Sequence, residues 1–174
     1  MSRNYPDRVR VEKVAAAERQ FSGSMPLQTL QRVADLLTLP DPEDVVNFRI
    51  QFGHDGLGRV VADVMIETDA PLTCQRTLDR FLLPIKSQSR VGIVSSPDQA
   101  SELPEDYEPL VCETDELEIA RLVEEELILA LPLVPMDPSA PAPDQPAEAS
   151  QNEAKEPTHR PFEVLAKLKK ERPS

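Results

Sequence analysis

Few of the side chains that usually carry catalysis or hold a metal occur in this chain. They are two cysteines, Cys74 and Cys112, and two histidines, His54 and His159. No serine or cysteine lies in a nucleophile motif, and no glycine-rich phosphate loop is present. His54 stands beside an Asp-Gly pair that is typical of a turn, and His159 lies close to a proline. We therefore predict that the protein is not an enzyme.

A zinc site is the next chemistry that these residues suggest. Zinc prefers thiolate and imidazole ligands, usually in closely spaced pairs. Cys74, Cys112, His54 and His159 are scattered along the chain, and their spacings match no known zinc pattern. The sequence therefore predicts no metal and no cofactor, and Cys74 is expected to pack as a small apolar residue.

Basic residues in the middle of the chain share even-numbered positions. They are Arg76, Arg80, Lys86 and Arg90. Within a regular strand, side chains at even positions point to one face, where four cations could follow the phosphates of RNA. Phe81 is the only aromatic residue nearby, so few aromatic side chains are available to stack on RNA bases. The alternative is a solvated outer sheet face that binds nothing.

Acidic residues are concentrated between Asp98 and Glu126, where twelve acids accompany a single base, Arg121. The net charge of −12 argues against a simple nucleic-acid-binding domain. An acidic face over residues 98–126 would suit a basic protein partner. The alternative is that the excess acid keeps the protein soluble.

These side chains must be positioned by the elements around them, and the clearest element is a helix that begins near Leu117 and ends before Pro132. Apolar residues recur there at helical spacing and form one face. They are Ile119, Leu122, Val123, Leu127, Ala130 and Leu131. Proline stops the helix because it lacks an N–H and clashes with the preceding turn, and Pro135 keeps the next residues extended.

Glu126 breaks this apolar face, because it lies about 20° from Ile119 at 100° per residue. It is either on a solvent-facing rim of a tilted helix or held against the core by a basic or hydroxyl partner. An unpaired buried charge would cost several kcal/mol, so the second arrangement requires such a partner. Partner binding or anchoring of the core is expected from this region. The residues are Glu125, Glu126, Leu131, Pro132 and Pro135.

Three stretches carry a resemblance to a known family. VEEELILALPLVPMD, the preceding ELPEDYEPL and the terminal RPFEVLAKLKK resemble the YceD family, the large ribosomal RNA subunit accumulation proteins. In this family a Cys-x-x-Cys turn occurs where the chain has Cys74-Gln75-Arg76-Thr77, so a hydroxyl replaces the second thiolate. The resemblance implies a turn between two strands at this point.

The resemblance also implies a function. It points to a cytoplasmic, non-enzymatic factor that supports accumulation or processing of large-subunit (23S) ribosomal RNA. Contact with precursor RNA would be direct or through a ribosomal protein, without DNA or membrane. The alternative is an adaptor that binds a basic ribosomal protein or an RNA-processing enzyme through the acidic 98–126 face.

The rest of the chain predicts an α+β fold. Residues 7–11 are expected to form a strand, residues 12–17 a helix, and Pro26 to begin a helix that ends before Pro40. Residues 46–52 alternate apolar and polar, the clearest strand signal, and Gly53 to Gly56 would turn into a partner strand at 60–67. Further strands are expected at 81–85, 90–94 and 110–112. We predict a curved antiparallel sheet, a partial barrel, packed by the N-terminal helices and the central helix.

Composition divides the chain into three parts. A core domain is expected over residues 1–136 and a disordered linker, rich in proline, alanine and acid, over 137–158. Residues 159–174 would form a tethered amphipathic helix. Its lysines, Lys167, Lys169 and Lys170, are a second candidate for RNA contact, or they interact only with the helix dipole. Two cysteines, no hydrophobic signal segment and no long apolar run predict a cytoplasmic protein.

Overall fold

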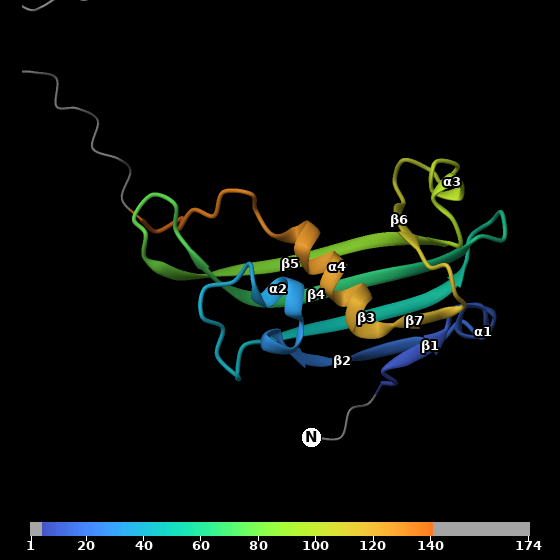
Figure 1. Ribbon diagram of the computed structural model, residues 1–174, viewed down its shortest axis with the longest axis horizontal. Helices are drawn as coiled ribbons and strands as arrows, with labels where there is room; N and C mark the ends of the chain where they lie inside the picture. Colours follow the sequence, from blue (N-terminus) through green and yellow to red (C-terminus); the bar gives the residue numbers. More distant parts are fainter. Residues whose placement is uncertain (1–4, 141–174) are drawn as a thin grey trace, which may run out of the picture. The chain divides into compact units, whose positions relative to one another are not determined.

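A five-stranded sheet forms the centre of the computed structural model, which describes residues 5–140. Its strands lie in the order β2-β3-β4-β5-β6, and all neighbours are antiparallel except β5 and β6. The helices α2 and α4 cross one face of this sheet (Figure 1). The five strands are Gln20–Pro26, Val45–His54, Val60–Thr73, Arg80–Val94 and Glu108–Val111.

A second sheet of two strands lies beside the N-terminal helix. In it β1 (Arg8–Arg10) pairs with β7 (Glu116–Glu118), which brings the N-terminal segment against the segment that precedes α4. The helix α1 (Val11–Ala16) follows β1 directly, and α4 (Ile119–Ala130) follows β7 directly. β7 was not predicted, and the predicted start of the central helix near Leu117 lies within this strand.

The three long strands follow the alternation of their side chains. In β3, Val46, Phe48, Ile50 and Phe52 are buried, while Asn47 and Arg49 between them are exposed. Strands with one buried and one solvated face are expected to alternate in this way. The predicted strand at 46–52 and its partner at 60–67 are confirmed.

The turn between β3 and β4 differs from the prediction. Gly53 and His54 still belong to β3, and the chain turns over residues 55–59 instead. The Asp55 carboxylate accepts the N–H groups of Leu57 and Arg59, both at 2.9 Å, and Gly58 has a φ of +79°. Aspartate can form its own local turn in this manner, and glycine adopts a positive φ without strain. Asp55 and Gly58 therefore favour a turn at residues 55–59 rather than at 53–56.

Pro71 lies within β4, beyond the partner strand predicted at 60–67. Strand β4 continues to Thr73, and Pro71 pairs with Leu82 of β5. The pairing of β3 with β4 ends at Asn47 and Glu67, so beyond that point β4 has a strand on one side only. A proline lacks a backbone donor, and such an edge position tolerates it. The predicted strands at 81–85 and 90–94 are likewise one continuous strand, β5.

The helix predicted to begin at Pro26 is replaced by two short pieces. Pro26 ends β2 in an extended conformation, and a 3-10 turn, η1 (Leu27–Thr29), precedes α2 (Gln31–Ala34). Leu30 lies between them with a φ of −91° and a ψ of 90°, outside the helical region. Leu27, Leu30 and Val33 are all buried, so burial of these side chains outweighs continuity of the helix.

The apolar face of α4 closes the core against the sheet. Ile119, Leu122, Val123 and Leu127 are each no more than 1% exposed. Full burial of such side chains stabilises by about 1.5–3 kcal/mol each. A twelve-residue helix is marginal alone, so this packing, rather than helix propensity, maintains α4. None of the helices in residues 5–140 has the length and apolar character needed to cross a membrane.

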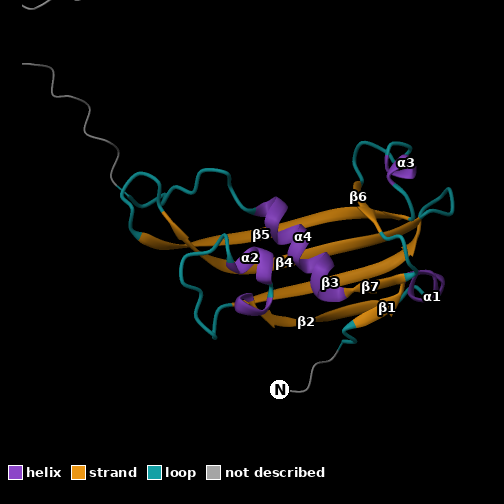
Figure 2. Cartoon of the chain, viewed as in Figure 1, coloured by secondary structure: helices purple, strands orange, loops and turns teal. Residues whose placement is uncertain are grey.

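The predicted α+β class is confirmed, with a mostly antiparallel sheet that is not closed. Strands and helices alternate irregularly along the chain, and β6 adds a parallel edge after the short helix α3 (Pro97–Ala100) (Figure 2). The predicted sheet was antiparallel throughout, so the parallel pairing of β5 with β6 is a correction.

The first compact unit ends at Ala140, four residues beyond the expected core boundary at 136. The predicted linker from residue 141 onward and the predicted C-terminal helix with Lys167, Lys169 and Lys170 lie outside the described residues. The division at 136, 137–158 and 159–174 stays a prediction.

Candidate functional site

The face of the sheet opposite α4 is polar and open over most of its length. Side chains of β2, β3, β4 and β5 that point to this outer face form rows across the strands. One row contains Ser22, Arg49, Met65 and Gln88, and the next contains Ser24, Asn47, Glu67 and Lys86. At one end the face is covered near Gly92, where an added Cβ would lie 2.7 Å from Leu103.

The basic residues of β5 share this outer face, as their even positions predict. Arg80, Lys86 and Arg90 are exposed, and the odd-numbered residues between them are buried or half-buried. Arg76 is different, because it lies in the turn between β4 and β5 rather than in a strand. The expectation that all four cations share a strand face is therefore wrong for Arg76.

Three of the four predicted cations use their donors within the protein. Arg90 binds both carboxylate oxygens of Asp63, at 2.7 and 2.9 Å, and its pKa is raised mainly by this contact. Arg80 donates to the Thr38 carbonyl at 3.1 Å and pairs with Asp41 and Asp44. Arg76 donates to the carbonyls of Asp137 and Ala140. These arginines are less available to an external phosphate than the sequence suggested.

Two cations on the outer face remain without an ion-pair partner among residues 5–140. They are Lys86, which lies opposite Glu67 across the β4–β5 pair, and Arg49, which lies opposite Met65. Both line an open groove of about 440 Å³ together with Ser22, Asn47 and Gln88 and with one acid, Glu67. Arg49 was not a candidate from the sequence, although the alternation of β3 placed it on the polar face.

The chemistry of this groove suits a phosphate backbone more than exposed bases. Arg49 and Lys86 supply positive charge, and the serine and amide side chains supply donors and acceptors. The aromatic residue in its lining, Phe48, is 4% exposed and packs edge-on against Tyr5. Aromatic surfaces for base stacking are therefore not offered by the residues that line the groove.

Glu126 lies on the opposite side of β5, in the core. Its side chain is 3% exposed, and its carboxylate accepts hydrogen bonds from Ser87 at 2.6 Å and from Ser89. Both serines alternate with the outward cations of β5, so one strand serves the groove and the core. Burial of Glu126 with hydroxyl partners agrees with the second of the two arrangements considered from the sequence. No basic residue fills this role.

The carboxylates next to Glu126 connect elements rather than face solvent freely. Glu125 forms an ion pair with Arg32 at 2.6 Å, and Glu124 accepts the Arg32 backbone N–H at 2.7 Å, which joins α4 to α2. Glu108 is near enough for its pKa to be raised by burial and, secondarily, by the charge of Glu126. Glu125 therefore contacts α2, and Glu126 contacts β5.

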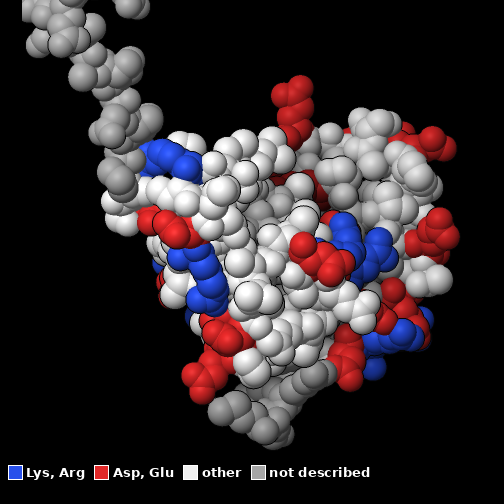
Figure 3. Space-filling model, turned by 60° about the vertical axis from the view of Figure 1, so that its left-hand side comes forward, with Lys and Arg blue, Asp and Glu red and all other residues white. Residues whose placement is uncertain are grey.

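The residues after α4 secure the chain against the β4–β5 turn. Leu131 packs partly against the core, and Pro132 is exposed. The carbonyl of Pro135 accepts the Gln75 N–H at 2.9 Å. Charged side chains border a broad uncharged area on this side of the molecule (Figure 3).

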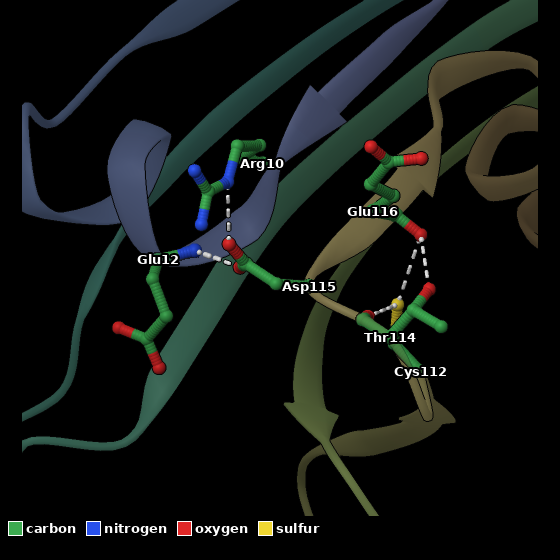
Figure 4. A network of polar contacts seen from close by, with 6 residues as sticks. All are labelled: Arg10, Glu12, Cys112, Thr114, Asp115 and Glu116. Atoms are coloured by element: carbon green, nitrogen blue, oxygen red, sulfur yellow. Dashed lines mark hydrogen bonds and ion pairs between the residues drawn. The ribbon is translucent and has the colours of Figure 1, made fainter.

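The acidic stretch does not form a single acidic face. Asp115 binds Arg10 at 3.0 Å and the Glu12 N–H at 2.9 Å, and its pKa is lowered first by the Glu12 N–H (Figure 4). Glu118 binds Arg8 at 2.9 Å. N-terminal arginines thus neutralise part of the 98–126 region, and the prediction of one continuous acidic face is wrong.

Cys74 begins the turn between β4 and β5 and is fully buried. Its sulfur accepts the Asp137 N–H at 3.4 Å, and this contact, followed by the Thr77 N–H, lowers the pKa of the thiol to about 7. The turn predicted at Cys74–Thr77 is confirmed. Within residues 5–140, no three cysteine, histidine or acidic side chains gather as a metal site would require.

The stability of the protein should rise with pH because of Cys74. Between its folded pKa of about 7 and the higher pKa of an unfolded cysteine, the unfolded chain binds more protons, so the free energy of unfolding increases with pH. This contribution is lost as the pH falls through 7. Denaturant unfolding between pH 6 and about 9 should show the rise in the native chain and its loss in Cys74→Ala.

Cys112 provides the matched control. Burial raises the pKa of its thiol, so its contribution has the opposite sign and is lost as the pH rises through the raised value. Cys112→Ala should therefore keep the rise that Cys74 produces. An unchanged pH profile in Cys74→Ala would contradict the assignment.

The sequence was compared with protein families and with known proteins. The family described as "Large ribosomal RNA subunit accumulation protein YceD" matches residues 62–169. A relative of that name from Haemophilus influenzae is 33% identical, over 91% of this chain and 94% of its own.

The chain belongs to the YceD family.

The YceD match covers β4, β5 and α4, and thus both Lys86 of the groove and the Glu126 contacts. Arg49 lies before the matched residues. The YceD name describes a role in accumulation of large-subunit ribosomal RNA, as an accumulation factor rather than an enzyme. No solved structure matches the chain.

Proposed function

We propose that this protein supports the accumulation of large-subunit ribosomal RNA by binding precursor RNA directly through the outer face of its sheet. The observation that supports this most is the pair Arg49 and Lys86, two exposed cations without an ion-pair partner in residues 5–140 that line one groove. Phosphate contacts supply most of the affinity in such interfaces. A net acidic protein can bind RNA when its cations are gathered on one face.

The test is binding of labelled transcripts that tile the precursor of large-subunit ribosomal RNA. Exchanging Arg49 and Lys86 together for glutamine should weaken binding roughly tenfold and flatten the dependence of log K on log salt concentration by about 1.4–1.8. Fluorescence anisotropy at several salt concentrations measures both quantities. Both side chains are exposed, so the variant should remain folded.

A second pair gives the control for the change in net charge. Lys13 on α1 and Arg121 on α4 are also exposed and lie outside the groove. Their joint exchange for glutamine should change affinity and salt dependence little. Equal losses in the two variants would mean that the groove has no special role and that net charge alone controls binding.

The adaptor function remains a second proposal, on a smaller surface than the sequence suggested. Asp98, Glu102, Glu105 and Asp106 surround the loop after α3, and none has an ion-pair partner among residues 5–140. A basic ribosomal protein would find uncompensated negative charge there. Salt-insensitive or absent RNA binding by the isolated protein would favour this adaptor function over direct contact.

A further inference from the structure

Exposed large apolar side chains are concentrated at one end of the described molecule. They come from three segments: the loop after α2, the β4–β5 turn with the start of β5, and the chain after α4. We call this surface the apolar end. Its residues are Leu36, Leu39, Leu78, Leu82, Leu133, Val134 and Met136.

Hydrogen bonds hold the three segments side by side. The Thr38 N–H donates to the Pro71 carbonyl at 2.8 Å, and the hydroxyls of Thr38 and Thr73 are 2.7 Å apart. On the other side of the turn, the Gln75 N–H donates to the Pro135 carbonyl at 2.9 Å. The apolar end is therefore a positioned surface, built by segments that are far apart in the sequence.

The exposure of these side chains is large. Leu133 is 101% exposed and Val134 is 60% exposed, although both lie within four residues of the end of α4. With this side of the molecule turned forward, Figure 3 shows a broad area without charged side chains, bordered by acidic and basic groups. Exposed large apolar side chains gathered in this way usually mark a site of interaction.

The charges around the apolar end indicate what it attracts. The segments 35–44, 71–82 and 131–140 contain six acids and two arginines. The acids are Asp35, Asp41, Glu43, Asp44, Asp79 and Asp137. The arginines, Arg76 and Arg80, are occupied by contacts within the protein. Negative charge would repel RNA phosphates and anionic lipids and would attract a basic polypeptide.

We infer that the apolar end is a docking surface for a segment of a basic partner protein that presents large apolar side chains beside lysine or arginine. Apolar side chains of the partner would cover Leu133 and Val134, and its cations would meet the surrounding carboxylates. This is the recognition mode of an amphipathic segment on an apolar surface. It is independent of the proposed RNA contact, which uses the groove lined by Arg49 and Lys86.

The experiment uses the full chain and a synthetic peptide of about 18 residues with leucines at helical spacing and lysines elsewhere. Binding is measured by anisotropy, and the contacted amides are mapped by NMR. We expect shifts in the three segments, and at least tenfold weaker binding when Leu133 and Val134 are both changed to serine. A peptide with glutamates in place of the lysines should also bind at least tenfold more weakly.

Leu57 is the matched control. It is 76% exposed in the β3–β4 turn, away from the apolar end, and Leu57→Ser should leave peptide binding unchanged. Equal weakening by Leu57→Ser, or no peptide binding, would overturn the inference. So would three other results of the Leu133/Val134 double substitution: loss of a dimer in sedimentation, NMR shifts in residues 159–174 without peptide, or weaker binding of the ribosomal RNA transcripts.

Discussion

Replacing Glu126 with alanine is expected to lower the free energy of unfolding by about 2–4 kcal/mol. The substitution deletes the acceptor of two serine hydroxyls, Ser87 and Ser89, on the half-buried inner side of β5. Ser87 then loses its partner, and Ser89 is left with Glu108, whose pKa it lowers. Urea unfolding of the two proteins measures the difference.

A suitable control for Glu126 lies on the same helix. Arg121 is exposed on α4, and Arg121→Ala should cost under about 0.5 kcal/mol. Glu124 is unsuitable as a control, because its carboxylate accepts the Arg32 N–H at the start of α2. Equal small losses for Glu126→Ala and Arg121→Ala would show that the hydroxyl contacts contribute little.

A combined substitution separates the hydrogen bonds from the packing. Changing Glu126 to leucine while both serines become alanine removes every polar partner and restores most of the apolar volume. Replacement of a buried polar cluster by apolar side chains is often neutral or stabilising. This triple variant should therefore be more stable than Glu126→Ala alone. If the triple variant is less stable than Glu126→Ala, the carboxylate and the two serine hydroxyls contribute more to stability than the pairing of their own polar groups.

Phe52→Ala is expected to have the largest effect of any single substitution considered, about 3–5 kcal/mol. Phe52 lies near the end of β3, is 1% exposed, and is the largest of the fully buried side chains in residues 5–140. Its removal leaves a cavity in a region where the strand and the packed helices have little freedom to collapse. Calorimetry or denaturant unfolding would measure the loss.

Phe21 is the control for Phe52. Its ring meets that of Phe52 edge-on, with centroids 6.1 Å apart, but Phe21 is only half-buried on β2. Phe21→Ala should cost about 1–2 kcal/mol, and the double variant should reveal a coupling of about 0.5–1.5 kcal/mol. Losses of the same size for both single variants would contradict the placement of the core.

The sequence predicted well those features that depend on a single element. Alternation in residues 46–52 identified β3, and helical spacing identified the buried face of α4 together with the unusual position of Glu126. Periodicity works here because one face of each element must be removed from water. It failed at Pro26, which was predicted to begin a helix but ends β2 in an extended conformation.

Contacts between distant residues decided the candidate site. The sequence indicated that Arg80 and Arg90 share a face with Lys86, but not that carboxylates bind both arginines. Four cations in the middle of the chain were predicted to contact RNA. In the structure Lys86 is the one of these four that lines the groove, and Arg49 from β3 lines it as well. Which cation is available depends on sheet register, and register is set by pairing across the whole sheet.

By itself, the sequence determined the class of the fold and the family, and it placed Glu126 on the apolar face of the helix without deciding whether its carboxylate is buried. Tertiary structure decided that Ser87 and Ser89 satisfy Glu126, that Arg8 and Arg10 neutralise part of the acidic stretch, and that seven exposed apolar residues meet at one end. The physical reason is distance along the chain. Hydrophobic periodicity is recorded within a dozen residues, whereas Arg8 and Glu118 pair across 110 positions.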